Sequence, residues 1–200
     1  DISIIIVNYK VRKELLACID SIYKTAKGLS LEIIVVDNDE VKTLKDPLRK
    51  RFPKVIYVPS KENVGWGEGI NIGAKYAKGK YLYLLNPDTI LLPNALQIVY
   101  EHAISSAQLG VVASRLVDFD KKPYYPLGSK VLTPLRAIVS YTFLENIFPF
   151  SFLARDFFAE DKKDDISNVE IAPLTASLIK TTMFKSVGGF DKNFFLYFEE

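Results

Sequence analysis

Ser3–Val7 (SIIIV) is a run of mainly β-branched residues, and Arg12–Ala26 follows it with apolar side chains at helical spacing. The same alternation repeats along the first half of the chain. Further strands are expected at Ile33–Val36 (IIVV), Val55–Val58, Tyr81–Leu85 and Gly110–Leu116, and further helices at Gly67–Ala77 and Pro93–Ala107. Strands that are apolar on both faces and alternate with helices predict an α/β fold, with a Rossmann-like, mostly parallel sheet covered by helices on both faces.

The second half of the chain has a weaker pattern. Residues 121–165 mix prolines, aromatic residues and charges without a clean period, whereas order returns at Val169–Ile179 and in a short helix at Thr181–Val187. A chain of 200 residues, 48% of them hydrophobic, is expected to form a single domain. Because it stops abruptly after Glu200, we expect it to be a C-terminally truncated fragment of a longer protein.

Composition excludes several classes of function. The net charge is only +2 and the basic residues are dispersed, which argues against binding of nucleic acid. The chain starts without a signal peptide, and Arg136 and Glu145 interrupt its apolar segment Val131–Leu153, so a cytoplasmic location is expected. Cys18, the single cysteine, is interpreted as a buried structural thiol.

Polar clusters follow four of the expected strands. They are Asn8-Tyr9, Asp37-Asn38-Asp39, Ser60–Asn63 and Asn86-Pro87-Asp88. Ligands of doubly wound sheets bind outside the carboxyl ends of the strands, so these clusters are expected to converge on one rim. Each cluster alone is also compatible with ordinary turn chemistry.

The segment Asn63–Asn71 (NVGWGEGIN) follows a strand and opens a helix, where backbone N–H groups can approach a phosphate. It matches neither the dinucleotide-binding fingerprint nor a P-loop. The alternative is a flexible helix entry, with Gly73 allowing close helix packing.

Two acidic positions are candidates for chemistry. Asp88 ends a buried strand, where it could share a divalent cation with a diphosphate, or it could simply sit in a turn. Glu199-Glu200 follows the aromatic stretch Phe194–Phe198, and apolar surroundings suit a general base. Two adjacent acids are equally compatible with a solvated face.

Taken together, these motifs resemble the family 2 inverting glycosyltransferases, and in particular their rhamnosyltransferase-like branch. The resemblance runs from Ser3 to the last residue. The matching pieces are Ile6-Val7-Asn8-Tyr9, Val35-Val36-Asp37-Asn38, Asn63-x-Gly65-x-x-x-Gly69-x-Asn71, Leu85-Asn86-Pro87-Asp88, and Gly188-Gly189-Phe190-Asp191 leading to Phe194-Phe195-x-Tyr197-Phe198-Glu199-Glu200. Each is weak alone, but the set in this order and spacing is highly specific.

The resemblance implies a GT-A fold, with a nucleotide-sugar-binding half at residues 1–117 and an acceptor-binding half at residues 118–200. It implies binding of the donor nucleotide by a set of strand-end residues: Asn8 and Tyr9 around the base, Asp37 hydrogen-bonded to it, Asn63, Gly65 and Gly69 around the ribose and diphosphate, and Asn86 beside them. Asp88 would hold Mg²⁺ or Mn²⁺ as the last acid of a D-x-D motif, whose first Asp is replaced by Asn86.

The implied reaction transfers a sugar from a UDP- or dTDP-sugar to a hydroxyl of a glycan or lipid-linked acceptor in cell-surface polysaccharide synthesis. Glu200 occupies the position of the family's catalytic base, and Glu199 is the second candidate. A single base and an in-line attack invert the anomeric centre.

Two alternatives of another class remain open. The chain could be a catalytically silent nucleotide-sugar-binding or scaffold domain, which Asn86 and the Glu199-Glu200 pair would suit, or, with weaker support, a nucleotidyltransferase. The aromatic-rich stretch Tyr124–Phe158 is either a second small core or a surface that meets the cytoplasmic face of a membrane, with Phe148, Phe150 and Phe152 exposed.

Overall fold

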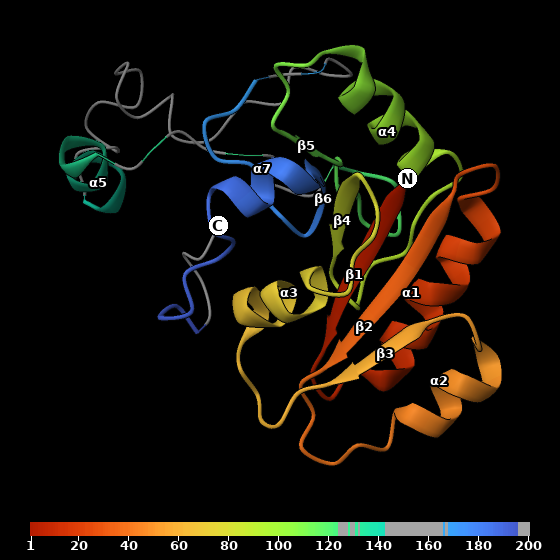
Figure 1. The fold of residues 1–200 in the computed structure, drawn as a ribbon. Helices are drawn as coiled ribbons and strands as arrows, with labels where there is room; N and C mark the ends of the chain where they lie inside the picture. The colour runs from red at the N-terminus through yellow and green to blue at the C-terminus, as the bar shows by residue number, and fades with distance from the viewer. Residues whose placement is uncertain (124–127, 129–130, 132, 143–165, 167, 196–200) are drawn as a thin grey trace. The chain divides into compact units, whose positions relative to one another are not determined.

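The computed structural model describes residues 1–123, 128, 131, 133–142, 166 and 168–195 (Figure 1). The chain divides into two compact units: residues 1–114 together with the chain from residue 174 onward, and residues 115–173. Within the described residues, none of the helices combines the length and apolar character needed to cross a bilayer.

The first unit is built on a six-stranded sheet. Its strands are β1 (Ile2–Asn8), β2 (Leu31–Asp37), β3 (Ile56–Pro59), β4 (Tyr81–Leu85), β5 (Val111–Ala113) and β6 (Ala176–Lys180), in the order β3-β2-β1-β4-β6-β5. Strands β1 to β4 are parallel to one another, and β6 is antiparallel to both of its neighbours, β4 and β5. The sheet is therefore mixed but mostly parallel, as the sequence predicts.

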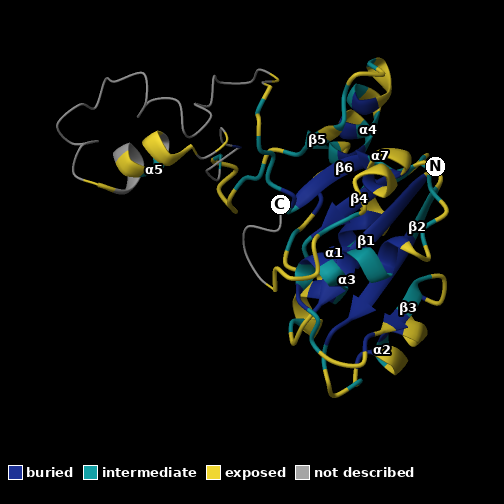
Figure 2. Cartoon of the chain, turned by 60° about the vertical axis from the view of Figure 1, so that its left-hand side comes forward, coloured by how far each residue is buried: buried dark blue, intermediate teal, exposed yellow. Residues whose placement is uncertain are grey.

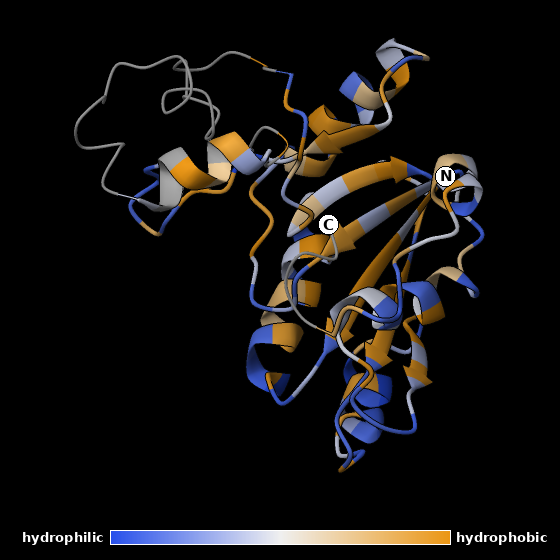
Figure 3. Cartoon of the chain, turned by 90° about the vertical axis from the view of Figure 1, so that its left-hand side faces the viewer, coloured by the Kyte–Doolittle hydropathy of each residue, from blue (hydrophilic) through white to orange (hydrophobic). Residues whose placement is uncertain are grey.

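Helices cover both faces of this sheet, because its central strands are apolar on both sides (Figures 1 and 3). The first unit contains α1 (Arg12–Thr25), α2 (Lys45–Arg51), α3 (Trp66–Ala74), α4 (Ala95–Ser105) and α7 (Thr181–Ser186). Helices α3 and α7 lie on one face and α1 on the other (Figure 1). The second unit contains α5 (Pro134–Tyr141).

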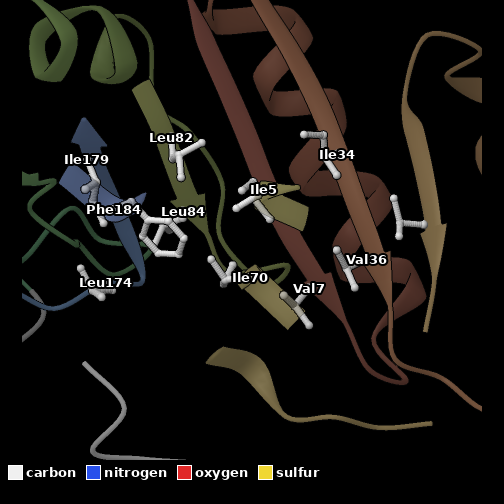
Figure 4. Packing of buried hydrophobic residues seen from close by; sticks show 12 residues of the cluster. Ile5, Val7, Ile34, Val36, Ile70, Leu82, Leu84, Leu174, Ile179 and Phe184 are labelled. Carbon is white, nitrogen blue, oxygen red and sulfur yellow. The ribbon is translucent and has the colours of Figure 1, made fainter. Parts of the chain in front are cut away.

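Core side chains alternate between the two faces of the sheet along each strand. Ile5 and Val7 of β1 point toward α3, where they join Val36 and Ile70 (Figure 4). Because successive side chains of a strand point to opposite faces, the buried Ile4 belongs to the other side. These side chains are at most 5% exposed, and Figure 2 shows the central strands as mostly buried, with β1 buried along its whole length. Burial of each large aliphatic side chain contributes roughly 1.5–3 kcal/mol, so this layer dominates the stability of the unit.

Glycines allow α3 to approach the sheet closely. A Cβ atom added at Gly73 would lie 2.5 Å from Cγ2 of Ile5, and one added at Gly69 would lie 2.8 Å from Cγ1 of Val7. Both distances are shorter than a carbon–carbon contact. Close packing at Gly73, which the alternative interpretation of this segment proposes, is thus seen in the structure, and Gly69 packs in the same way.

Some expected boundaries differ from the structure. Within Val169–Ile179, where order is expected to return, strand β6 begins only at Ala176, and Val169 packs beside Gly128 in the second unit. The strand expected at Gly110–Leu116 shortens to Val111–Ala113 and pairs antiparallel with β6. Helix α4 begins at Ala95 instead of Pro93, because Asn94 takes a left-handed conformation with φ 64°.

Candidate active site

The carboxyl ends of the parallel strands meet at one rim, as expected. Asn8 is the register partner of Asp37, and Asp37 is the partner of Pro59, which precedes the Ser60–Asn63 cluster. Asn86 follows β4, whose Leu84 pairs with Ile5 of β1. The four polar clusters of the sequence therefore come from adjacent strands at the same edge of the sheet.

A buried carboxylate stands at the centre of this rim. Asp37 is fully buried, and its Oδ1 accepts hydrogen bonds from Asn8 Nδ2 at 2.9 Å and from the backbone N–H of Asp39 at 3.3 Å. Its Oδ2 accepts a hydrogen bond from the Tyr57 hydroxyl at 2.7 Å. A carboxylate offers about four lone-pair sites, so these three donors leave acceptor capacity for a ligand.

Tyr57 is a site residue that the sequence analysis does not identify. Burial, and then the hydrogen bond to Asp37, raise the pKa of Tyr57 well above its usual value. The hydroxyl therefore stays protonated and acts as a donor at physiological pH. Its signal in the sequence is a tyrosine in the short third strand, which register alone places beside β2.

Asn38 links two parts of the rim. Its place in the motif Val35-Val36-Asp37-Asn38 does not predict this role. Its Nδ2 donates to the carbonyl oxygen of Gly65 at 2.9 Å and to Asn63 Oδ1 at 3.3 Å. Asn63 Oδ1 also accepts the backbone N–H of Gly65 at 3.2 Å. These contacts fix the loop that opens α3 to the end of β2.

Several amide oxygens of the rim lack protein partners. The Oδ1 atoms of Asn8, Asn38 and Asn86 are buried, and each is without a hydrogen-bond partner among the described residues. For Asn8 and Asn38 the orientation of the amide is set by its other end, because Nδ2 faces an acceptor. Leaving such an acceptor unsatisfied costs about 1–3 kcal/mol, so a ligand with N–H or O–H groups, or a cation, would recover this energy.

The residues after β4 offer oxygen ligands to a hard cation. The turn is held by Asn86, whose N–H donates to Thr175 O at 2.8 Å and whose carbonyl accepts the Thr89 hydroxyl at 2.7 Å. Asp88 is exposed beyond it, and the unpartnered Asn86 Oδ1 lies two residues away in the chain. In the described part of the chain, no three His, Cys, Asp or Glu side chains are grouped so that they could hold a metal ion. One carboxylate and one amide oxygen fit a Mg²⁺ or Mn²⁺ ion that completes its shell with phosphate oxygens and water.

Cys18 is the structural thiol that the sequence predicts. It is fully buried, and its Sγ donates to the carbonyl oxygen of Asn86 at 3.7 Å. Burial raises the pKa of this thiol to about 12, so it is unreactive at neutral pH.

Tyr9, Gly65 and Gly69 are the remaining residues expected to bind the nucleotide, and each has different surroundings. The Tyr9 ring is 39% exposed, with the Lys10 ammonium 4.8 Å from its centroid, so one face can stack on a ligand. Gly65 has φ 84°, and a Cβ there would overlap the carbonyl oxygen of Phe195. Gly69 is buried against Val7.

The candidate bases Glu199 and Glu200 lie outside the described residues, as do Phe148, Phe150 and Phe152. The described chain ends at Phe195, beside Gly65. The rim therefore brings together Asn8, Asp37, Asn63, Gly65 and Asn86, and the assignment of the base stays a prediction.

Comparison with known proteins agrees with this architecture. The family model for glycosyl transferase family 2 matches residues 3–187. The low-salt glycan biosynthesis hexosyltransferase Agl10 of Haloferax volcanii is 24% identical over 204 residues, covering 100% of this chain and 59% of the relative.

Two solved structures share the fold. S. aureus TarS 1–349 in complex with UDP has a TM-score of 0.62 at 14% identity, covering 100% of this chain and 52% of that chain. The mannosyltransferase PcManGT from Pyrobaculum calidifontis, in complex with GDP-Man and Mn²⁺, has a TM-score of 0.61 at 15% identity, covering 96% and 48%. The chain thus spans about half to three-fifths of the length of these proteins. It has the GT-A fold that the resemblance implies, and it belongs to glycosyl transferase family 2.

Proposed function

We propose that the protein is an inverting glycosyltransferase that passes a sugar from a nucleoside-diphosphate donor to an acceptor hydroxyl. The main support is the rim of buried acceptors at the carboxyl ends of β1, β2 and β4. It is complementary to a ligand that has N–H groups, hydroxyls and a cation-bound diphosphate, which is the chemistry of a nucleotide sugar.

The base of the donor would bind at Asp37. A carboxylate with one free lone pair accepts the ring N–H of uracil or thymine, and the Asn8 Oδ1 atom is a second acceptor beside it. Tyr9 would stack on the base. We therefore propose a UDP- or dTDP-sugar as the donor, including a rhamnose-type sugar.

Asp88 and Asn86 would hold Mg²⁺ or Mn²⁺ on the diphosphate, with Asn63 and Gly65 lining the ribose and phosphates. Such a cation neutralises charge that develops on the departing nucleoside diphosphate. Asp88 orients the diphosphate, and the backbone at Gly65, fixed by Asn38, limits where the donor can lie.

Glu200, or Glu199 as the second candidate, would remove the proton of the acceptor hydroxyl. An attack in line with the departing diphosphate then inverts the anomeric carbon, with no covalent intermediate on the protein. The acceptor would be a glycan or a lipid-linked glycan of the cell surface, reached at the cytoplasmic face of the membrane.

The test is calorimetric titration of UDP, dTDP and GDP with and without Mn²⁺, comparing the wild type with Asp88→Ala. We expect Mn²⁺-dependent binding that Asp88→Ala weakens at least roughly tenfold, since the lost ligand is charged. Release of nucleoside diphosphate from UDP-glucose, UDP-N-acetylglucosamine, GDP-mannose or dTDP-rhamnose then tests turnover. Binding without turnover from any donor would favour the silent scaffold, and absence of binding would refute both.

A further inference from the structure

The side-chain amide of Asn71, on α3, forms two hydrogen bonds with the backbone of a segment that is distant in sequence. Its Nδ2 donates to the carbonyl oxygen of Phe190 at 2.8 Å, and its Oδ1 accepts the N–H of Phe190 at 2.9 Å, across a separation of 119 residues. A side chain that satisfies both backbone groups of one residue fixes the orientation of that residue as well as its position.

The amide itself is held in place by Glu68. Glu68 Oε2 accepts the second N–H of Asn71 Nδ2 at 2.8 Å, from a position three residues earlier on the same face of the helix. Both N–H groups and the oxygen of Asn71 are thus used, and only one orientation of the amide satisfies all these contacts. Asn71 is therefore preorganised to receive Phe190.

The two glycines before Phe190 have different requirements. Gly188 and Gly189 both have positive φ, at 86° and 77°. A Cβ at Gly188 would meet no described atom within 4 Å, whereas one at Gly189 would overlap Asn71 Oδ1. Gly189 is therefore required for the approach of Asn71 in addition to its backbone conformation.

The same helix contacts the segment at further points. The Phe190 ring packs edge-on against Trp66 of α3, with centroids 5.2 Å apart, and it also packs against Phe184 of α7 at 5.7 Å. Farther along, the carbonyl oxygen of Phe195 lies against Gly65 at the start of α3. The segment from Gly189 to Phe195 is thus tied to α3 near both of its ends.

We propose that Asn71 is a positioning residue for sugar transfer, which rests on the proposed function. Asn71 attaches the segment around Phe190 to α3, and this segment leads in sequence to Glu199 and Glu200. The loop that enters α3 lines the donor site through Gly65. Removal of the Asn71 side chain would then misplace the acceptor-side machinery while leaving the base-binding contacts at Asp37 unchanged. The motif that contains Asn71 and the motif that contains Gly189-Phe190 contact each other directly. Sugar transfer would therefore need both.

The test compares Asn71→Ala, Gly189→Ala and Gly188→Ala in the full-length protein, which retains the segment that leads to Glu199 and Glu200. Affinity for UDP with Mn²⁺, turnover of the best donor of the panel, and emission of Trp66 are measured for each. Trp66 is the single tryptophan of the chain and contacts Phe190, so its emission reports undocking of the segment without any ligand. Circular dichroism confirms that each variant is folded.

For Asn71→Ala we expect a red shift of Trp66 emission, a fall in kcat of about 10²-fold and a UDP Kd within about twofold of the wild type. Gly189→Ala should lose more activity than Gly188→Ala, because both strain the backbone but only the first displaces Asn71. In the Asn71→Ala background the two glycine variants should lose equal amounts.

Equal effects of the two glycine variants in the wild-type background, or parallel losses of UDP affinity and turnover in Asn71→Ala, would overturn the positioning role. A shift of Trp66 emission with unaltered kcat would also overturn the positioning role, but it would not contradict the transferase function. Absence of turnover by the wild type from every donor would instead overturn the proposed function, and the positioning role with it.

Discussion

Three donors converge on the Asp37 carboxylate: Asn8 Nδ2, the backbone N–H of Asp39 and the Tyr57 hydroxyl. Asp37 itself is predictable, because an acid directly after an apolar strand falls at the ligand-binding edge of the sheet. Asn8 is predictable in the same way. Tyr57 is not, because it reaches Asp37 only through the register between β2 and β3, and local sequence does not encode the pairing of two strands.

Replacement of Tyr57 by Phe should lower the free energy of unfolding. The hydrogen bond that it removes lies within the protein and ends on a charged oxygen, and such bonds contribute about 1.5–3 kcal/mol to stability. Urea unfolding measures this loss. Tyr76→Phe is the matched control, since the Tyr76 ring is half exposed on the surface, and equal effects of both variants would contradict the role of Tyr57.

The stability of the protein should fall at alkaline pH, partly through Cys18. Burial raises the pKa of its thiol from 9.0 to about 12, so between these values the folded state keeps a proton that the unfolded state has lost. This contribution to stability is complete below pH 9 and is lost as the pH rises toward 12, at up to about 1.4 kcal/mol per pH unit.

Denaturant unfolding at several pH values between 8 and 11 measures the slope. Cys18→Ala should show a shallower decline than the wild type above pH 9. A residual decline is expected from Tyr83, because burial raises the pKa of its hydroxyl to about 12 as well. Identical slopes for the two proteins would contradict the assignment to Cys18.

At the scale of elements, the sequence predicts the existence of the strands and helices better than their partners. The strand at Tyr81–Leu85 has the expected bounds, and α3 begins one residue before the expected Gly67. The insertion of β6 between β4 and β5 could not be predicted, because an antiparallel strand from a distant part of the chain leaves no periodic signal in the segments it joins.

Gly73→Ala should destabilise the protein although alanine is the better helix former. Propensity alone would favour the variant by about 1 kcal/mol. The new Cβ, 2.5 Å from Ile5 Cγ2, instead forces α3 away from the sheet, and such overpacking costs about 1–3 kcal/mol. Urea unfolding of Gly73→Ala, Ile5→Ala and the double variant tests this, because relief of the overlap makes the double variant more stable than the sum of the single effects predicts.

At the scale of the whole molecule, the chain returns to its first unit after residues 115–173. The loss of alternation beyond Asp118 is visible in the sequence, but the secondary structure of this stretch could not be predicted, because prolines and aromatic residues there have no clean period. Its helix α5 exposes Leu135 and Ile138, and a membrane contact of this part stays a proposal.

Leu135→Glu combined with Ile138→Glu should reduce binding to vesicles that contain anionic lipid by at least roughly tenfold, since each inserted aliphatic side chain contributes about 1.5–3 kcal/mol. Vesicle sedimentation measures the bound fraction. Ile98→Glu is the control, because Ile98 is 61% exposed on α4 in the other unit. Unchanged binding of the double variant would refute the membrane contact.

The place of β6 in the sheet also determines when this protein can fold during its synthesis. A ribosome that has translated β1 to β5 has made all four parallel strands, but β5 still lacks its partner and β4 has an open edge. The six-stranded sheet is complete only after Ala176–Lys180 has emerged from the exit tunnel. Completion of the sheet that carries the polar rim thus waits for a strand translated after residues 115–173.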